Sequence, residues 1–285
     1  MTPVSRMVAV VAAVLTAVAG SFPLAAQPSG GGVEAPFADA RARDLWQVAV
    51  SHRLGFRDSL VEYVAVVKQR MATNLRMPLK DRTLYRAEGA TRVFWTRDGN
   101  TVVQVLGARE RTPVGASENP GRMDLLDVAF DPLSDQLLFG LVEVGDGAAP
   151  DGDDFWFEHP LEPRWRGGYR FATGDSMAVT RPDGGRLEVV ELEVAPTVAD
   201  VHRVVGSLWI EPESGALVRA VYRLSDIFDA FRDVSDLREE EDEDLGFIPG
   251  MFKPWTFELS LVAVDYAWWE GDVWLPRTLR AEGMA

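Results

Sequence analysis

The chain has 285 residues, of which 47% are apolar, and it carries a formal net charge of −15 at pH 7. Such an acidic chain repels nucleic-acid phosphates, and no concentrated run of basic residues offsets this, so we expect no nucleic-acid partner. The sequence contains no cysteine, which excludes disulfides, thiolate metal sites, a cysteine nucleophile and a lipidated cysteine.

The beginning of the chain has the pattern of a secretory signal peptide. Arg6 supplies a positive charge, residues 7–19 are apolar, and Ala25 and Ala26 are the small residues that a signal peptidase requires. An exported protein without disulfides depends on burial of its core, which favours the periplasm or outer membrane of a Gram-negative bacterium. The predicted organisation is a signal peptide (1–26), a flexible linker (27–35) and a single β-rich domain (36–285).

The first segment of the domain, 36–52, has the features of a helix. It begins with a proline, and Leu45, Val48 and Ala49 form one apolar stripe. Gly55 follows the stripe, as a glycine often does just beyond a helix end. We therefore predict a helix that ends before Gly55.

The rest of the domain is dominated by strand patterns. Segment 59–75 has apolar residues at helical spacing, yet its many β-branched and aromatic residues favour a strand. Four pairs of alternating segments then flank short turns rich in Gly, Asp and Glu. The predicted hairpins are 91–97 with 101–110, 177–181 with 186–194, 201–210 with 216–224, and 255–269 with 273–279. They imply an antiparallel sheet of at least eight strands, which must curl, close or be covered because open edges aggregate.

Two insertions interrupt this pattern. Residues 145–162 form a loop rich in Gly, Pro and Asp. The second insertion, 226–254, begins with apolar residues at helical spacing, which predict a lid-like helix. It continues with six consecutive acidic residues, 239–244, which we expect to be exposed and disordered.

No catalytic motif is present in the sequence. A serine hydrolase elbow, G-x-S-x-G, does not occur, and we interpret Gly174-Asp175-Ser176 as an ordinary hairpin turn. His52, His159 and His202 are far apart and form no zinc motif. The acidic residues at 151–154 do not fit an EF-hand, and we favour a solvated loop over an irregular calcium site. We therefore expect no catalytic residue, metal or cofactor.

Two hairpins resemble those of a known family. The stretch 206–219 reads GSLWIEPESGALVR and resembles a hairpin of envelope proteins with the lipoprotein-carrier (LolA-like) fold. The segments 264–266 (VDY) and 274–277 (WLPR) are similar to the last hairpin of that family. The similarity covers roughly residues 165–280. It implies an unclosed antiparallel barrel wrapped around short helices, with acyl chains bound in the hollow.

The sequence departs from this family by its long acidic insertion, 226–254. Regions similar to this domain also occur at the N-terminus of larger bacterial proteins whose C-terminal half resembles an outer-membrane barrel. The chain could accordingly be part of such a protein, acting with an outer-membrane partner.

The sequence thus predicts a mainly β fold, a curled antiparallel sheet or unclosed β-barrel with an N-terminal helix and an inserted lid-like helix. The leading function is a non-enzymatic exported envelope protein that binds a lipid, a lipoprotein acyl chain or another apolar ligand in the concave face. The alternatives are a periplasmic structural or interaction module and a hydrolase whose site is assembled from scattered Asp, Glu and His. The residues predicted to line the cavity are Leu208, Ile210, Leu217, Val221, Phe228, Phe231, Leu259 and Leu261.

The leader predicts export with cleavage after Ala26. Protein expressed in a Gram-negative host should therefore appear in the periplasm with Gln27 at its N-terminus. Intact mass spectrometry of the periplasmic fraction measures this directly. A product that keeps Met1 and stays in the inner membrane would contradict the prediction.

Overall fold

The computed structural model describes residues 36–75, 82–97, 101–111, 157–181, 184–229, 233, 256–269 and 273–284. The predicted signal peptide, the linker and the acidic run 239–244 lie outside these residues. Of the described residues, 64% belong to strands, so the protein is mainly β, as the sequence predicts.

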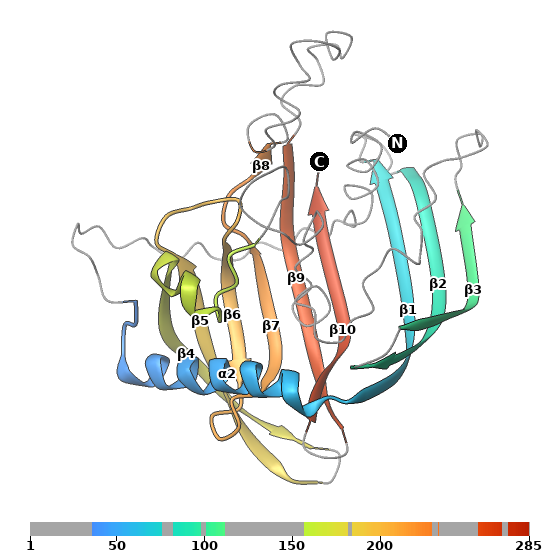
Figure 1. The fold of residues 1–285 in the computed structure, drawn as a ribbon. Helices are drawn as coiled ribbons and strands as arrows, with labels where there is room; N and C mark the ends of the chain where they lie inside the picture. The colour runs from blue at the N-terminus through green and yellow to red at the C-terminus, as the bar shows by residue number, and fades with distance from the viewer. Residues whose placement is uncertain are drawn as a thin grey trace.

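The described strands form two antiparallel sheets, one of three strands and one of seven (Figure 1). The three-stranded sheet has the order β1-β2-β3, with β1 Glu62–Leu75, β2 Arg82–Thr96 and β3 Val102–Arg111. The seven-stranded sheet has the order β10-β9-β7-β6-β5-β4, and β8 pairs with β9 beside this path. Its strands are β4 Tyr169–Thr180, β5 Arg186–Pro196, β6 Val204–Ile210, β7 Leu217–Leu224, β8 Phe228–Asp229, β9 Thr256–Trp269 and β10 Val273–Met284. The helical elements whose bounds fall within the described residues are α2, Ala40–Ser59, and the short 3₁₀ helix η1, Pro163–Gly168.

The four predicted hairpins are confirmed. Strands β2 and β3, β4 and β5, β6 and β7, and β9 and β10 pair as antiparallel neighbours. Most of segment 59–75 is also a strand, β1, as its β-branched residues favour, although Ser59 is still the last residue of α2. Because the two sheets are open and β4 and β10 lie at opposite ends of the larger one, the described strands do not close into a single barrel.

Two local predictions are wrong in detail. Helix α2 does not end before Gly55 but continues to Ser59, because Phe56 is buried in the core one residue beyond that glycine. Gly174-Asp175-Ser176 is not a hairpin turn but an irregularity inside β4, where the register shifts between Thr173 and Ser176. A Cβ at Gly174 would meet the Glu191 side chain, which also accepts a hydrogen bond from the Asp175 N–H at 3.1 Å.

The predicted lid-like helix is only partly covered by the structure. Phe228, one of its first apolar residues, belongs to the short strand β8 and pairs with Phe257 of β9. Asp233 is helical, whereas Phe231 and most of the insertion lie outside the described residues.

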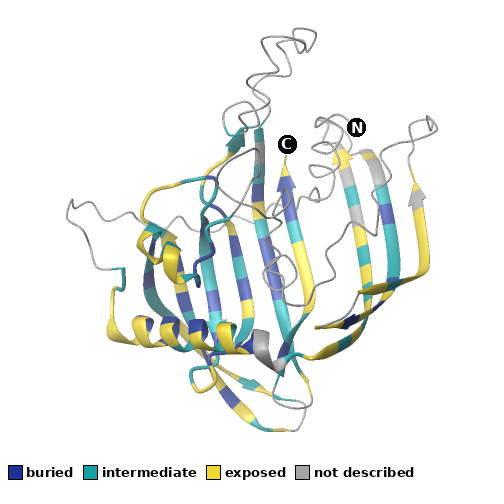
Figure 2. Cartoon of the chain, viewed as in Figure 1, coloured by how far each residue is buried: buried dark blue, intermediate teal, exposed yellow. Residues whose placement is uncertain are grey.

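Helix α2 lies across one face of the seven-stranded sheet and forms the main core with it (Figure 2). Trp46 is its largest contribution: the ring packs 5.7 Å from Phe37 and 6.1 Å from Phe171, measured between ring centroids. The indole Nε1–H donates to the carbonyl oxygen of Pro160 at 3.0 Å, so its polar atom is satisfied. The sheet contributes side chains at every second position, among them Leu192, Leu208, Ile210, Ala220 and Val264.

The beginning of α2 is fastened to the edge strand β4. Asp39 caps the helix by accepting from the Ala42 N–H at 2.8 Å. Its carboxylate also accepts from the Thr173 hydroxyl at 2.7 Å and from the Thr173 N–H at 3.0 Å. Led by the bond from the Thr173 hydroxyl, these hydrogen bonds hold the pKa of Asp39 below its ordinary value. Phe37 extends the connection by bridging in parallel to Phe171.

Strand β5 is buried on both faces at one end of the sheet. Val190 and Leu192 belong to the main core, whereas Leu187 and Val189 point the other way into a second cluster with Trp274. In that cluster Arg181, at the end of β4, lies 5.4 Å from the ring centroid of Trp268 on β9. Strands β5, β6 and β7 separate these two residues in the sheet order, so the sheet curls strongly at this end.

Two glycines provide a matched test of how closely α2 packs. Gly184 and Gly215 have φ angles of +84° and +76°, and each lies in the loop of a hairpin. A Cβ at Gly184 would meet nothing, whereas a Cβ at Gly215 would overlap the carbonyl oxygen of Val48 in α2.

Gly184→Ala should therefore cost only the left-handed backbone penalty, about 1–2 kcal/mol. Gly215→Ala should cost that penalty and about 1–3 kcal/mol more, because the helix must move away from the turn. Urea unfolding monitored by tryptophan fluorescence gives both free energies. Equal losses for the two variants would contradict the close contact between α2 and the β6–β7 turn.

Candidate functional site

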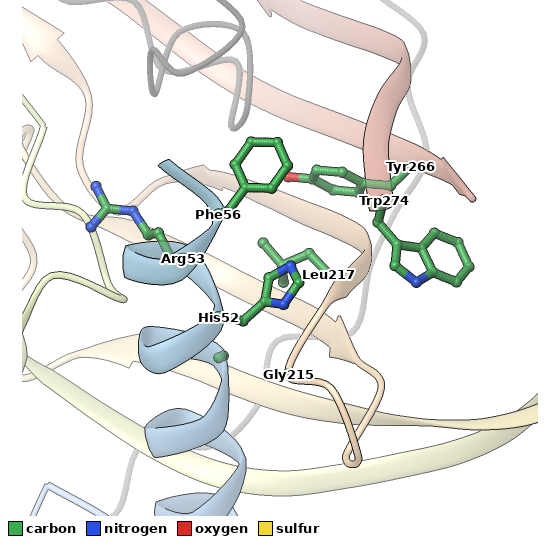
Figure 3. Close-up of a pocket in the computed structure, with 8 residues that line it drawn as sticks. His52, Arg53, Phe56, Gly215, Leu217, Tyr266 and Trp274 are labelled. Carbon is green, nitrogen blue, oxygen red and sulfur yellow. The ribbon is translucent and has the colours of Figure 1, made fainter. Parts of the chain in front are cut away.

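A small apolar cavity lies beneath the C-terminal half of α2 (Figure 3). Its volume is about 40 Å³. Phe56 and His52 project from α2 toward side chains of the seven-stranded sheet. The lining residues are Ala49, His52, Arg53 and Phe56 of the helix, Gly215 and Leu217 at the start of β7, Tyr266 of β9 and Trp274 of β10.

The volume of the cavity limits the size of a ligand that can bind without a structural change. A single water needs roughly 10–15 Å³ by this measure, so 40 Å³ has room for a few small groups. An acyl chain of a dozen methylenes does not fit unless α2 or its side chains move.

His52 is a titratable residue that lines this cavity. Burial lowers the pKa of its imidazole, although a hydrogen bond with the backbone of Ser214 and the charge of Glu211 act in the opposite direction. The ring is therefore mainly neutral at pH 7, which suits its place among apolar side chains.

An ion pair joins the C-terminal end of α2 to the segment before η1, on the side of the helix away from the cavity. Arg53 Nη1 donates to Glu162 Oε2 at 2.9 Å, and the Arg53 side chain is only 10% exposed. A pair in this setting is weakly screened by solvent, so removal of either partner leaves a partly buried charge. The segment 157–162 thus braces the helix opposite the cavity.

Leu60, immediately after α2, joins the interiors of the two sheets. It packs against the main core and also against a smaller cluster built on Val93 and Trp95 of β2. The two apolar clusters therefore meet at this residue. We call Phe56, Leu60, Leu217, Tyr266 and Trp274 the α2 junction.

The apolar face of the large sheet is not covered everywhere near the α2 junction. Leu279 of β10 is the cross-strand partner of Val264 and so faces the same side. Val264 is completely buried, yet Leu279 is 44% exposed. Leu279 lies on the strand at the end of the large sheet, farther along β10 than Trp274, the residue of this strand that lines the cavity.

The residues predicted to line a cavity fall into different environments. Leu208, Ile210 and Leu259 are buried in the main core, where neighbouring side chains already fill the space. Leu217 lines the small cavity. Phe228 is half-buried in β8, and Phe231 lies outside the described residues.

The remaining two predicted residues, Val221 and Leu261, point to the other face of the sheet. Each alternates with a core residue, Val221 with Ala220 and Leu261 with Val262, and successive residues of a strand face opposite sides. Of the eight predicted residues, the structure therefore places only Leu217 in the α2 junction.

The polar residues considered in the sequence lie elsewhere. The Glu158 N–H donates to the His202 carbonyl oxygen at 2.8 Å, and Arg203 Nε donates to Glu158 Oε2 at 2.5 Å. The buried Tyr169 hydroxyl donates to the Glu158 carbonyl oxygen, and burial raises the pKa of this phenol. These bonds fasten segment 157–162 to the start of β6. Among the described residues, no group of three His, Asp or Glu side chains is placed to hold a metal ion.

The apolar pattern of the sequence could have predicted the helix side of the α2 junction, had Gly55 not been interpreted as the end of the helix. Leu45, Ala49, His52 and Phe56 recur at three- or four-residue spacing, so the apolar stripe continues through Gly55. The next step of the same stripe is Leu60. The roles of Tyr266 and Trp274 could not be predicted from a local pattern in the sequence, because only the pairing of β9 with β10 brings these residues to this helix end.

Comparison with known proteins finds no match: no family model, curated protein or solved structure is similar to this chain. No helix in the described part of the chain is long and apolar enough to span a membrane. The case for the α2 junction therefore rests on its own residues.

The position of His52 predicts how stability depends on pH. Because burial lowers its pKa in the folded protein below the ordinary 6.5, the unfolded chain binds this proton more readily. The free energy of unfolding should be highest above that value and fall as the pH drops through 6.5 toward the folded pKa. His52→Gln should flatten this dependence in chemical unfolding between about pH 7.5 and 5. A variant with the wild-type slope would contradict burial of a neutral ring.

Proposed function

We propose that the protein is a non-enzymatic exported protein of the Gram-negative cell envelope that binds the apolar chain of a lipid or lipoprotein at the α2 junction. The observation that carries this proposal is that the apolar clusters of the two sheets meet at the end of α2, where Leu60 packs against both. The LolA-like pattern of the hairpin at 206–219 supports the same kind of ligand.

The α2 junction is the part of this interior where a ligand can be accommodated. Over strands β4 to β7 the helix side chains Leu45 and Trp46 fill the space, and both are buried. At the junction the helix ends, a small cavity is present, and the apolar face of β10 continues without cover at Leu279. A chain lying from the cavity along β10 would bury that exposed surface.

The energetics allow such binding without a charged contact. Burying a dozen methylenes contributes on the order of 10 kcal/mol, at about 0.8 kcal/mol each. Association and ordering reduce this several-fold, since the ligand loses freedom and the end of α2 must shift. Micromolar affinity therefore lies within reach of a purely apolar site.

A second candidate function is a periplasmic interaction module with no internal ligand. The dense packing of α2 favours it, because Gly215 touches the helix backbone and most of the concave face is already occupied. The two proposals differ in one observable property, the presence of an apolar ligand bound to purified protein.

Leu279→Asp tests the ligand proposal without disturbing the core, since this side chain is 44% exposed. Met177→Asp is the matched control, because Met177 is 46% exposed and lies on β4 at the far end of the sheet. We expect Leu279→Asp to weaken binding of a fluorescent fatty acid at least about tenfold. The substitution removes apolar contact worth about one to two methylene groups of the ligand, and at about 0.8 kcal/mol each this corresponds to roughly a factor of ten. Met177→Asp should bind like the wild type.

Native mass spectrometry of periplasmic protein purified without detergent should show a lipid bound to the wild type and less of it on Leu279→Asp. If no lipid co-purifies and the titration is flat, the interaction module takes the place of the ligand proposal. If both variants bind equally well, a ligand is present but does not lie along β10.

A further inference from the structure

The three-stranded sheet has an outer face that turns away from the cluster of Val93 and Trp95. On β2 the buried residues Thr91, Val93 and Trp95 alternate with exposed ones, and the strand register carries this division to both neighbours. Strand β3 at the edge is exposed along most of its length (Figure 2). We use "outer face" for the side of this sheet that carries Phe94 and Arg92.

One end of the outer face is apolar although it is exposed. Phe94 pairs with Val64 on one side and with Val102 on the other, so the three side chains form a contiguous row across the strands. Their exposed fractions are 40%, 65% and 57%, respectively. Val66, next to Val64 on the same face of β1, is 51% exposed. Exposed apolar groups on three neighbouring strands are typical of a contact surface.

The rest of the outer face is basic, in contrast to the acidic chain as a whole. Cross-strand pairing places Arg92 beside Val66, and Arg70 and Arg109 beside Glu88. Among the described residues of β1, β2 and β3, only the acidic residues Glu62 and Glu88 share this face. The basic residues are Lys68, Arg70, Arg86, Arg92, Arg109 and Arg111. At physiological ionic strength charges act over only about 8–10 Å, so the local excess of positive charge is not cancelled by acids elsewhere in the chain.

Glu88 organises the arginines rather than neutralising them. Its carboxylate accepts from Arg70 Nε at 3.0 Å, Arg86 Nη2 at 2.6 Å and Arg109 Nε at 2.7 Å. These bonds, led by those from Arg86, lower the pKa of Glu88 to about 2. Each guanidinium has five N–H donors, so most donors of the three arginines remain available to a further anion.

We propose that the outer face of the three-stranded sheet docks on an anionic lipid bilayer. The basic residues meet the headgroup phosphates, and the row of Val64, Phe94 and Val102 enters the boundary between headgroups and acyl chains. The occupant follows from the chemistry of the face. An exposed row of apolar side chains beside a field of arginines matches the layered interface of a bilayer, which offers phosphate and hydrocarbon within a few ångströms. The inference is separate from the apolar ligand of the α2 junction.

The test is co-sedimentation of periplasmic protein with vesicles of phosphatidylglycerol and phosphatidylcholine, compared with vesicles of phosphatidylcholine alone. Wild type should prefer the anionic vesicles and lose that preference at high salt. Lys68→Glu/Arg92→Glu reverses two charges that form no ion pair with another described residue, so the fold should tolerate it. Each lost basic residue weakens binding about fivefold, so the reversal should weaken it at least about twentyfold.

Arg164→Glu/Arg186→Glu is the matched control, with the same change in charge at exposed positions outside the three-stranded sheet. It should bind anionic vesicles within about twofold of the wild type. Val64→Ser/Phe94→Ser should weaken binding while leaving its salt dependence unchanged, because the apolar row contributes no charge. All three variants should bind the fluorescent fatty acid like the wild type, which separates this proposal from the ligand proposal.

Three outcomes would overturn the docking proposal. The first is equal binding of wild type to anionic and neutral vesicles, and the second is unchanged binding by Lys68→Glu/Arg92→Glu. The third is binding of a polyglutamate peptide, abolished by the same charge reversal, without any binding to phosphatidylglycerol. That result would make the outer face a docking site for an acidic protein.

Discussion

The packing of α2 against the seven-stranded sheet is the contact on which the rest of the described structure depends. An antiparallel sheet with one apolar face needs a cover, and here helix α2 packs into the main core of that face. Close approach is possible because Gly215 has no side chain where the helix backbone passes. The contact also positions the two ends of the helix, which serve different purposes. Asp39 fixes the first end to β4, whereas the second end leads through Leu60 directly into the smaller sheet.

The α2 junction follows from this asymmetry. A helix of 20 residues spans about 30 Å, so α2 runs from β4, where Asp39 is bound, to the cavity that Trp274 of β10 lines. Farther along β10 than Trp274, Leu279 stays partly exposed although its cross-strand partner Val264 is buried. The His52 ring, which lines the cavity beside the α2 junction, is kept mainly neutral by burial, and Arg53 is directed to Glu162 on the other side of the helix.

The sequence predicted those parts of the fold that local chemistry determines. Turns rich in Gly and Asp with alternating flanks identified all four hairpins, because a turn and its register are set by neighbouring residues. The order of the strands in space was beyond this reasoning, and with it the α2 junction, whose members come from α2, β7, β9 and β10. The basic outer face was missed for the same reason. No run of basic residues exists in the chain, and only the pairing of β1, β2 and β3 brings Arg70, Arg86 and Arg109 around Glu88. The predicted end of the helix before Gly55 was wrong for the opposite reason. There a local preference was clear, but the burial of Phe56 outweighed the weak tendency of a glycine to end a helix.

The two proposals become connected if both hold. The outer face and the cluster of Val93 and Trp95 lie on opposite sides of one three-stranded sheet, so the lipid surface and the apolar interior would be separated by on the order of 10 Å. Strand β1 is one edge of that sheet in the described structure, and β10 is an edge of the other. An acyl chain leaving a docked bilayer would then pass around the edge of β1 to reach Leu60 and the α2 junction. Such a route keeps the chain close to apolar groups, such as Val64 and Leu279, for most of its length. Since each methylene exposed to water costs about 0.8 kcal/mol, a short sheltered path is the physical requirement for any protein that takes lipid from a membrane.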